Sequence, residues 1–580
     1  MPAENSHFSP PTVLILGGGI HGAAVARELA FNGVPVVLAD TGDLATGATS
    51  KSSRLIHGGL RYLEYGDVGL VRESLIERRT LLTLAPQFVR PLRLFVPVQH
   101  RWSGLLRSAL GFFKLARTRA GRRLMGRTER RAPRGYWPIR MGLWLYDLFS
   151  WRDGLAKSRA IPVSNANLGT DSRTASLQPP RVDASRYRWL CAYSDAQMLY
   201  PERCVIALLT DAEHAARNQG VPLQIVPHAK IHWQGSTIHI SSTQPTATLA
   251  IRPKVIVNCS GAWGDITLKE IDAATTPLFA GTKGSHFVTR HPGLKSMLGE
   301  QGVYAETGDR RLAFILPFGE AVLVGTTDEA WAGIPDEAVA TDQELRYLLN
   351  VVETVFALTL TPGDIESHYS GVRPLPRTTD TSNAAISRDH SLAEHRLHGV
   401  PVLTLVGGKL TTFRSVASQI VDRVLKTLSQ PRIATTDDRP LIGAAKFPGD
   451  PSRWPDLWTK WAREYGSTEE EVAALWPLYG MQAETILADV TPLPRQPISD
   501  SPLSRRVVCW IIEHEWVTTL DDLVERRLML IFAPRLSVPL LRDLAECLVE
   551  TGRLSPGEVT DASERTAKRL RQHYGRVPGG

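Results

Sequence analysis

Short apolar runs and longer stretches of helical periodicity alternate along the first 430 residues of the chain. Residues 13–16 and 36–39 are continuously apolar, and residues 20–31 between them carry apolar and small side chains at helical spacing. Such a pattern is typical of buried strands joined by a packed helix. Further apolar runs at 255–257 and 402–406 extend it, so we predict an α/β domain.

The remaining pattern predicts two other kinds of structure. Residues 275–330 contain short β-like runs, including 313–317 and 322–328, which indicate a mixed α+β domain with an antiparallel sheet. From residue 454 helical periodicity dominates, interrupted by the proline-rich residues 491–502, and this predicts an all-α C-terminal domain. We expect a discontinuous nucleotide-binding domain at 12–100, 180–270 and 370–430, a basic insert at 101–179, a substrate domain at 271–369, a linker at 431–453 and the helical domain at 454–580.

A glycine motif follows the first apolar run. It occupies Gly17, Gly18, Gly19, Ile20, His21 and Gly22. In this G-x-G-x-x-G spacing Gly17 permits a tight turn, Gly19 lets a pyrophosphate approach the backbone, and Gly22 lets the helix pack closely on the sheet. Asp40 ends the next apolar run, where a carboxylate can accept bonds from a ribose hydroxyl. The motif predicts a Rossmann-like dinucleotide site, and FAD and NAD both remain open.

Composition places the chain among ordinary globular proteins. It has 580 residues, 43% hydrophobic and 22% charged, which is enough for several domains. The five cysteines form no C-x-x-C pair, which argues against a disulfide framework or a zinc site. No apolar run approaches 18 residues and the N-terminus is polar, so we expect a cytoplasmic protein without a membrane-spanning helix.

Positive charge is concentrated in one segment. The formal net charge is +8, but residues 101–140 alone hold twelve Lys or Arg against one acidic residue, Glu129, a net of +11. Within this segment apolar residues recur at helical spacing beside basic ones. They are Trp102, Leu105, Leu106, Leu110 and Phe113, with Arg107 and Lys114 to one side. A cationic amphipathic helix suits an anionic membrane surface, and an ordinary surface helix is the alternative. No recognition fold accompanies the basic residues, so we expect no nucleic-acid partner.

An ordered series of motifs resembles one family. The segments are 15–20, 55–64 (LIHGGLRYLE), 193–195, 283–286 (KGSH), 325–328 (GTTD), 369–375 (YSGVRPL), 408–412 (GKLTT), 514–517 and 521–523. The chain is similar in these to the FAD-dependent, membrane-associated glycerol-3-phosphate dehydrogenases, which are D-amino-acid-oxidase-like flavoproteins. It departs from them at residues 200–203, where the family usually has Asp-Asp-Ala-Arg and this chain has Tyr-Pro-Glu-Arg.

The resemblance implies a cofactor, a reaction and a location. The family binds FAD, oxidises sn-glycerol 3-phosphate to dihydroxyacetone phosphate and passes electrons to membrane quinone. For this chain it implies peripheral attachment to the inner face of the cell membrane, with a homodimer left open. The cofactor contacts implied are the glycine motif and Asp40, together with Thr49, Ser50, Ser53, Leu55, His57, Gly58, Gly261, Lys409 and Leu410.

The charge of a phosphate substrate and the resemblance together indicate which residues bind it and react. A phosphate dianion favours arginine, whose planar fork binds it in bidentate fashion. We therefore expect the substrate to contact Arg61, Tyr62, Arg311 and Arg388. The expected catalytic group is Arg373, Lys409 and His286: Lys409 stabilises reduced flavin, and histidine suits proton transfer near neutral pH. A hydrogen-bonded structural histidine is the alternative for both His57 and His286.

Two other functions remain open from the sequence. The first is an FAD-dependent oxidase of another hydroxy or amino compound that passes electrons to oxygen. The second is a non-enzymatic flavoprotein that docks at a membrane. The intact glycine motif, Arg373 and Lys409 argue against the second, and the set of arginines argues against the first.

Overall fold

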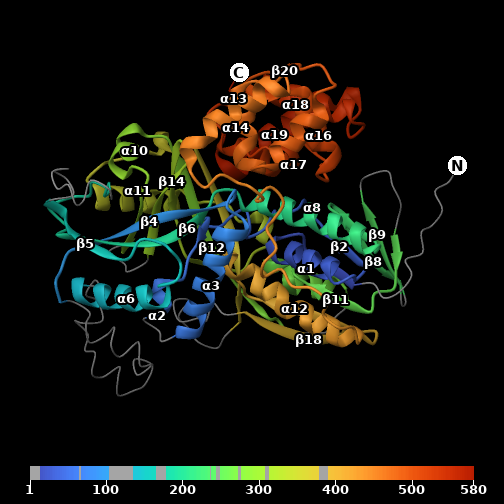
Figure 1. Cartoon of the computed structure of the whole chain (residues 1–580), viewed down its shortest axis with the longest axis horizontal. Coiled ribbons are helices and arrows are strands. Elements are labelled where there is room, and N and C mark those ends of the chain that lie inside the picture. The colour runs from blue at the N-terminus through green and yellow to red at the C-terminus, as the bar shows by residue number, and fades with distance from the viewer. Residues whose placement is uncertain are drawn as a thin grey trace.

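The computed structural model describes residues 13–63, 67–102, 135–164, 178–234, 237–242, 249–271, 276–306, 312–377 and 390–579. Two large sheets lie side by side, and the C-terminal helices, orange to red in Figure 1, gather above them. Within the described ranges, no helix is both long enough and apolar enough to cross a membrane.

The first sheet surrounds the glycine motif. Its order is β18-β19-β11-β1-β2-β7, and every pair is parallel except β18 with β19. The strands are β1 (Val13–Leu16), β2 (Val36–Ala39), β7 (Leu223–Val226), β11 (Val255–Asn258), β18 (Ser391–Leu397) and β19 (Val400–Val406). Helix α1 (Ile20–Phe31) packs between α8 (Pro201–Gln219) and α12 (Phe413–Leu428). All four residues of β1 and of β2 are buried, as continuous apolar runs predict. The Rossmann-like prediction is confirmed.

The second sheet is largely antiparallel and has ten strands in the order β16-β12-β15-β14-β13-β4-β6-β3, with β17 beside β12 and β5 beside β6. They are β3 (Leu55–Ile56), β4 (Val89–Val98), β5 (Arg159–Pro162), β6 (Trp189–Met198), β12 (Phe279–Thr289), β13 (Gly302–Glu306), β14 (Leu312–Phe318), β15 (Ala321–Gly325), β16 (Glu329–Trp331) and β17 (Ser367–Pro376). The predicted antiparallel sheet is confirmed.

The sheet topology differs from the expected domain boundaries at four strands. We placed residues 12–100, 180–270 and 370–430 in the nucleotide-binding domain, yet β3, β4, β6 and most of β17 from these ranges join the second sheet. Along β4 the side chains alternate between two cores: Leu94 packs with one cluster and Phe95 with another. A strand finds its partners far away in the sequence, so local patterning does not reveal to which sheet it belongs.

Helices cover both faces of the second sheet. α3 (Val68–Leu84) and α6 (Tyr136–Phe149) lie against β4 and β6, while α10 (Pro292–Leu298) and α11 (Asp342–Phe356) lie against β14 and β12. The smaller elements are α2 (Leu60–Leu63), α9 (Gly264–Glu270) and a three-stranded sheet of β8 (Ala229–Gln234), β9 (Thr237–Ser242) and β10 (Leu249–Ile251).

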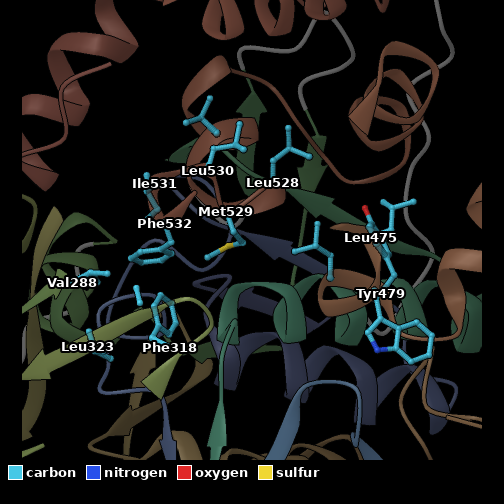
Figure 2. Packing of buried hydrophobic residues seen from close by; sticks show 14 of the residues in the cluster. Val288, Phe318, Leu323, Leu475, Tyr479, Leu528, Met529, Leu530, Ile531 and Phe532 are labelled. Atoms are coloured by element: carbon cyan, nitrogen blue, oxygen red, sulfur yellow. The ribbon is translucent and has the colours of Figure 1, made fainter. Parts of the chain in front are cut away.

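The C-terminal domain is helical, as predicted. It contains α13 (Trp454–Glu464), α14 (Glu469–Tyr479), α15 (Gln482–Val490), α16 (Arg505–His514), α17 (Leu520–Asp522), a π-helical turn η8 (Leu523–Arg527), α18 (Val538–Glu550) and α19 (Val559–Tyr574), with a hairpin of β20 (Pro497–Ile498) and β21 (Ser501–Ser504). Figure 2 shows how residues 528–532 reach down to the second sheet, where Phe532 meets Phe318 with ring centroids 4.9 Å apart. The domain shares one hydrophobic core with that sheet.

Candidate cofactor and substrate site

One cavity of about 1550 Å³ runs along the junction of the two sheets. Its walls include the glycine turn after β1, Asp40 after β2, residues 259–263 after β11 and residues 407–411 after β19. The carboxyl ends of parallel strands meet at one edge of a sheet, which is where nucleotides bind in folds of this kind. The opposite wall comes from the second sheet and includes His286, Asp328 and Arg373.

The glycine turn fits a pyrophosphate because side chains are excluded from it. Gly17 has a φ of +104°, and a Cβ there would lie 2.7 Å from the Cys259 carbonyl oxygen. A Cβ on Gly22 would lie 1.9 Å from the carbonyl oxygen of Gly17. The turn and the start of α1 therefore require glycine at both positions. The backbone N–H groups at this helix start and the helix dipole favour a phosphate charge.

Asp40 is fixed in the cavity wall beside the glycine turn. Its Oδ2 accepts a hydrogen bond from Gly18 N at 2.6 Å, and its Oδ1 accepts one from Gly42 N at 2.8 Å. Burial raises the pKa of Asp40 to about 6, while these two backbone bonds act in the opposite direction. Each carboxylate oxygen retains a lone pair, so the residue suits a ribose hydroxyl.

Residues 46–57 form the long wall between the glycine turn and the second sheet. Thr49 Oγ1 accepts a hydrogen bond from Ile20 N at 3.1 Å, so this threonine caps the start of α1. Ser53 Oγ lies 2.8 Å from His286 Nε2, and His57 N donates to Thr411 Oγ1 at 3.1 Å. The wall is therefore tied at one end to the glycine turn and at the other to β12, which carries His286, and to the turn after β19, which follows Lys409.

His21 adds an unsatisfied polar atom to the cavity wall. Its Nε2 is buried and has no hydrogen-bond partner. The atom packs against Gly408, because a Cβ built on that glycine would lie only 2.8 Å from it. Burial, helped by His390, lowers the pKa of His21 to about 4, so the ring is neutral near pH 7. Gly408 has a φ of +97°, a conformation that favours glycine. This buried ring nitrogen in the wall of the cavity therefore lacks the hydrogen-bond partner that such atoms normally have.

Arg373 on β17 lines the cavity on the side of the second sheet. Its guanidinium donates to Thr326 Oγ1 at 2.7 Å, to the Thr327 carbonyl oxygen at 3.2 Å and to Asp328 Oδ1 at 3.1 Å. Gly284 on β12 makes room for it, because a Cβ there would lie 2.1 Å from the terminal nitrogen Nη2. The side chains of Arg373 and Asp328 are 24% and 27% exposed, so an incoming anion can reach the pair.

His286 lies beside Arg373 but is fully buried. Its ring stacks on Tyr369 with centroids 4.9 Å apart, and its Nδ1 has no hydrogen-bond partner. Burial, followed by the charges of Arg373 and Arg54, holds the pKa of His286 well below its usual range. The ring is therefore neutral at physiological pH, in the protonation state that a base requires.

Lys409 and Tyr62 contact each other in the cavity wall. The Lys409 ammonium lies 4.3 Å from the centroid of the Tyr62 ring and donates to Ser74 Oγ at 3.3 Å. Both residues line the cavity, as do Leu410, Gly261, Ser53 and Leu55. The structure thus brings together the three residues expected to be catalytic and one of those expected to bind substrate.

Other predicted residues lie elsewhere. Gly18, Gly22, Ser50 and Gly58 stand behind the cavity wall: Gly58 N donates to Tyr146 Oη at 3.0 Å, and Ser50 Oγ donates to the carbonyl oxygens of Thr46 and Gly47. The Arg61 side chain, Arg311 and Arg388 lie outside the described residues, as do residues 103–134 of the basic insert. Their expected roles stay predictions.

The segment that departs from the family pattern, residues 200–203, contributes to two buried ion pairs. Glu202 accepts two hydrogen bonds from Arg54, at 2.7 and 2.9 Å, and Arg203 donates to Glu515 at 2.6 and 2.7 Å. None of residues 200–203 is among the described residues that line the cavity. Glu202, which differs from the family pattern, holds Arg54 of the cavity wall, whereas Arg203, which the family shares, joins the C-terminal domain.

Sequence reasoning assigned no role to three residues of the cavity wall. Asp328 stands at the end of the GTTD motif, so the motif itself could have drawn attention to it. Lys51 and Trp263 carried no comparable signal, since their importance depends on partners distant in the chain.

Comparison with known proteins agrees with the geometry. A family model described as FAD dependent oxidoreductase matches residues 12–414, and one described as the C-terminal domain of alpha-glycerophosphate oxidase matches residues 434–559. A glycerol-3-phosphate dehydrogenase from Synechocystis is 32% identical over 89% of this chain and 88% of its own length. A D-erythritol 1-phosphate dehydrogenase from Brucella abortus is 29% identical over 89% and 93%. The structure of a glycerol-3-phosphate dehydrogenase from Bacillus halodurans with FAD superposes with a TM-score of 0.69 at 19% identity, covering 97% of this chain and 95% of that one.

Proposed function

Because this chain belongs to the FAD-dependent glycerol-3-phosphate dehydrogenase family, we propose that it oxidises sn-glycerol 3-phosphate to dihydroxyacetone phosphate. The observation that supports this most directly is that Arg373, Lys409 and neutral His286 all line one cavity, together with a glycine turn that fits a dinucleotide pyrophosphate. Bound FAD supplies the hydride acceptor.

Three described residues have separate roles in this reaction. Arg373 holds the phosphate, and its planar guanidinium turns from Asp328 to the incoming dianion. His286 accepts the hydroxyl proton at Nδ1, the ring nitrogen that has no hydrogen-bond partner. The dianion also screens the Arg373 charge that disfavours protonated His286, so substrate binding itself raises the basicity of the ring. Lys409 places a positive charge beside the site, which favours a reduced, anionic flavin.

D-Erythritol 1-phosphate is the second candidate substrate. The Brucella abortus relative named for that substrate has almost the same identity to this chain as the glycerol-3-phosphate dehydrogenases do. Both substrates present a phosphate and a secondary alcohol, so Arg373 and His286 serve either one equally well.

We further propose that the acceptor is membrane quinone and that the protein docks peripherally on an anionic membrane face. The support comes from α6, which lies within the basic insert. Its exposed apolar residues recur every three or four positions, and continue just past its end: Trp137, Met141, Trp144, Leu148 and Trp151, with exposures of 40, 47, 63, 53 and 63%. Trp102, 61% exposed, packs on Trp137 at 5.7 Å between ring centroids. A tryptophan-rich face beside excess positive charge suits the headgroup region.

Anaerobic flavin reduction tests the substrate. The purified holoprotein is mixed with sn-glycerol 3-phosphate, D-erythritol 1-phosphate, glycerol or glycine, and flavin absorbance is followed. We expect rapid bleaching by glycerol 3-phosphate and none by glycerol, because only the phosphate engages Arg373. Preferential bleaching by erythritol phosphate selects the second candidate, and bleaching by glycine alone contradicts the proposal. Reoxidation of the reduced protein by a soluble quinone, compared with air, then tests the acceptor.

A further inference from the structure

The C-terminal domain holds the loop that directly follows Asp40. Arg527, in the π-helical turn η8, donates to Asp43 Oδ2 at 2.8 Å and Asp43 Oδ1 at 2.7 Å, and Arg526 bonds the same carboxylate. Asp43 directly follows Gly42, whose N–H binds Asp40. All three charged side chains are at most 5% exposed. The position of the ribose-binding carboxylate is therefore coupled to η8.

The residue directly before η8, Asp522 at the end of α17, reaches the same loop through His228. His228 N donates to the Gly42 carbonyl oxygen at 2.8 Å, and the His228 ring lies 3.0 Å from Asp522 Oδ2. Asp43, His228 and Asp522 converge in the manner of metal ligands. Arg526 and Arg527 already neutralise Asp43, however, so this cluster is an arginine-balanced ion network.

A second contact reaches the middle of the cavity wall. Lys51 lies between Thr49, which caps α1, and Ser53, which bonds His286. Its ammonium donates to Tyr574 Oη of α19 at 2.6 Å and lies 3.9 Å from the centroid of that ring. Gly371 on β17 leaves room for the stem of Lys51, since a Cβ there would lie 2.3 Å from Lys51 Cβ.

Tyr574 connects this contact to η8. Its hydroxyl donates to Glu525 Oε2 at 2.7 Å, and Glu525 also binds Arg526 at 2.6 Å and Arg569 at 2.5 Å. One five-residue turn thus holds Asp43 through its arginines and Lys51 through its glutamate. π-Helical turns are rare and occur frequently at functional sites.

We propose that η8 and Tyr574 form a cofactor clamp. Glu525, Arg526, Arg527 and Tyr574 are positioning residues for FAD, and they act through Asp43 on the loop after Asp40 and through Lys51 on the wall beside the rest of the cofactor. The C-terminal domain, which supplies no described residue to the cavity lining, thereby controls how tightly FAD is held.

The charge of Lys51 makes the clamp sensitive to pH. Burial lowers the pKa of Lys51 to about 7; Glu525 and Glu202 oppose this, while Arg569 and Arg526 add to it. Tyr369, His368 and His573 also face the ammonium. The charged lysine bonds Tyr574 more strongly and favours the negatively charged cofactor. As pH rises through 7 that charge is lost, so the clamp should loosen.

A matched pair of tyrosine variants tests the clamp. Tyr574→Phe removes the hydroxyl that joins Lys51 to Glu525. Tyr479→Phe is the control: Tyr479 is also buried, and its hydroxyl donates to Glu515 at 2.7 Å, but this pair meets Arg203 rather than the cavity wall. Apoprotein is prepared from each full-length variant, and FAD affinity and thermal unfolding are measured.

We expect Tyr574→Phe to raise the Kd for FAD about tenfold, as the loss of one hydrogen bond to a charged group predicts, with both apoproteins unfolding at similar temperatures. The Kd of Tyr479→Phe for FAD should stay within about twofold of the wild-type value, which is the smallest change that such a titration resolves. Equal loosening of FAD in the two variants, or none in Tyr574→Phe, overturns the clamp.

The pH dependence of FAD binding distinguishes a positioning role of Lys51 from a purely structural one. Between pH 6.5 and 8.5 the wild-type Kd for FAD should rise about tenfold, and Lys51→Met should remove that slope, since a neutral side chain cannot lose a proton. Asp40, with a pKa of about 6, contributes below this window. A slope that persists in Lys51→Met shows that another group titrates and overturns the role given to Lys51.

Discussion

At the scale of single residues, what each reacting group can bind depends on the charged residues beside it. Arg373 is the expected phosphate ligand, yet in this structure it is paired with Asp328 and hydrogen-bonded to Thr326. A neutral substrate cannot displace a carboxylate from a guanidinium, whereas a phosphate dianion can. We therefore expect Asp328 to compete with the substrate for Arg373 and so to make the cavity selective for doubly charged ligands.

The variant Asp328→Asn tests this competition. Removing one negative charge near Arg373 should lower the KM for sn-glycerol 3-phosphate about tenfold, because repulsion between nearby like charges disappears. Steady-state assays with a soluble dye acceptor measure the effect. Asp336→Asn is the control, since Asp336 also lines the cavity but bonds Trp263 at 2.9 Å. An increase in KM would instead show that Asp328 orients Arg373 for substrate.

At the scale of elements, the β1–α1 turn depends on the absence of side chains. The helix start lies so close to the preceding turn that Gly22 has no space for a Cβ, whereas the burial of β1 and α1 follows from their apolar sequence. Both the tight turn and the close helix are needed if the backbone is to face a pyrophosphate.

Gly22→Ala should abolish cofactor retention. An added Cβ meets the Gly17 carbonyl oxygen at 1.9 Å, so α1 must shift away from the pyrophosphate position. We expect the purified variant to hold less than about a tenth of the wild-type FAD, as read from the ratio of flavin to protein absorbance. Gly142→Ala, a change in the middle of α6 where the nearest atom is 3.8 Å away, should retain FAD fully. Normal FAD content in Gly22→Ala would contradict the role of this turn.

At the scale of the whole molecule, the two large sheets form the cavity, the C-terminal domain packs against them, and the apolar face of α6 is exposed. The parallel sheet, the antiparallel sheet and the C-terminal domain are joined by buried ion pairs such as Arg203 with Glu515 and Arg527 with Asp43. The exposed apolar face of α6 lies away from these contacts, as Figure 1 shows for its position at the edge opposite the C-terminal helices.

Replacing the two most exposed tryptophans of that face should weaken membrane docking. Trp144→Ser with Trp151→Ser removes about 2 to 3 kcal/mol of insertion per side chain, so binding to anionic vesicles in a sedimentation assay should fall at least tenfold. Activity with a soluble dye should be unchanged because neither residue lines the cavity. Ile433→Ser, an equally exposed position beside α1, is the control. Undiminished sedimentation of the double variant would exclude this face as the docking surface.

The sequence by itself determined the local features of this protein and, through the order of its motifs, its family. Residues close in the chain form the glycine turn, the strand after it and the acid at the next strand end, so spacing alone placed Gly17, Gly22 and Asp40 correctly on the cavity or behind it. Helical periodicity likewise identified the C-terminal domain.

Only the tertiary structure decided which residues distant in the chain form polar contacts or lie in strands of the same sheet. β4 and β6 join the second sheet through partners far along the chain, and Lys51 meets Tyr574 across 523 residues. Arg373 likewise meets Asp328 only because β17 and the loop after β15 lie on either side of β12. The energy of a buried ion pair depends on burial and on geometry within a few ångströms, and packing alone sets both.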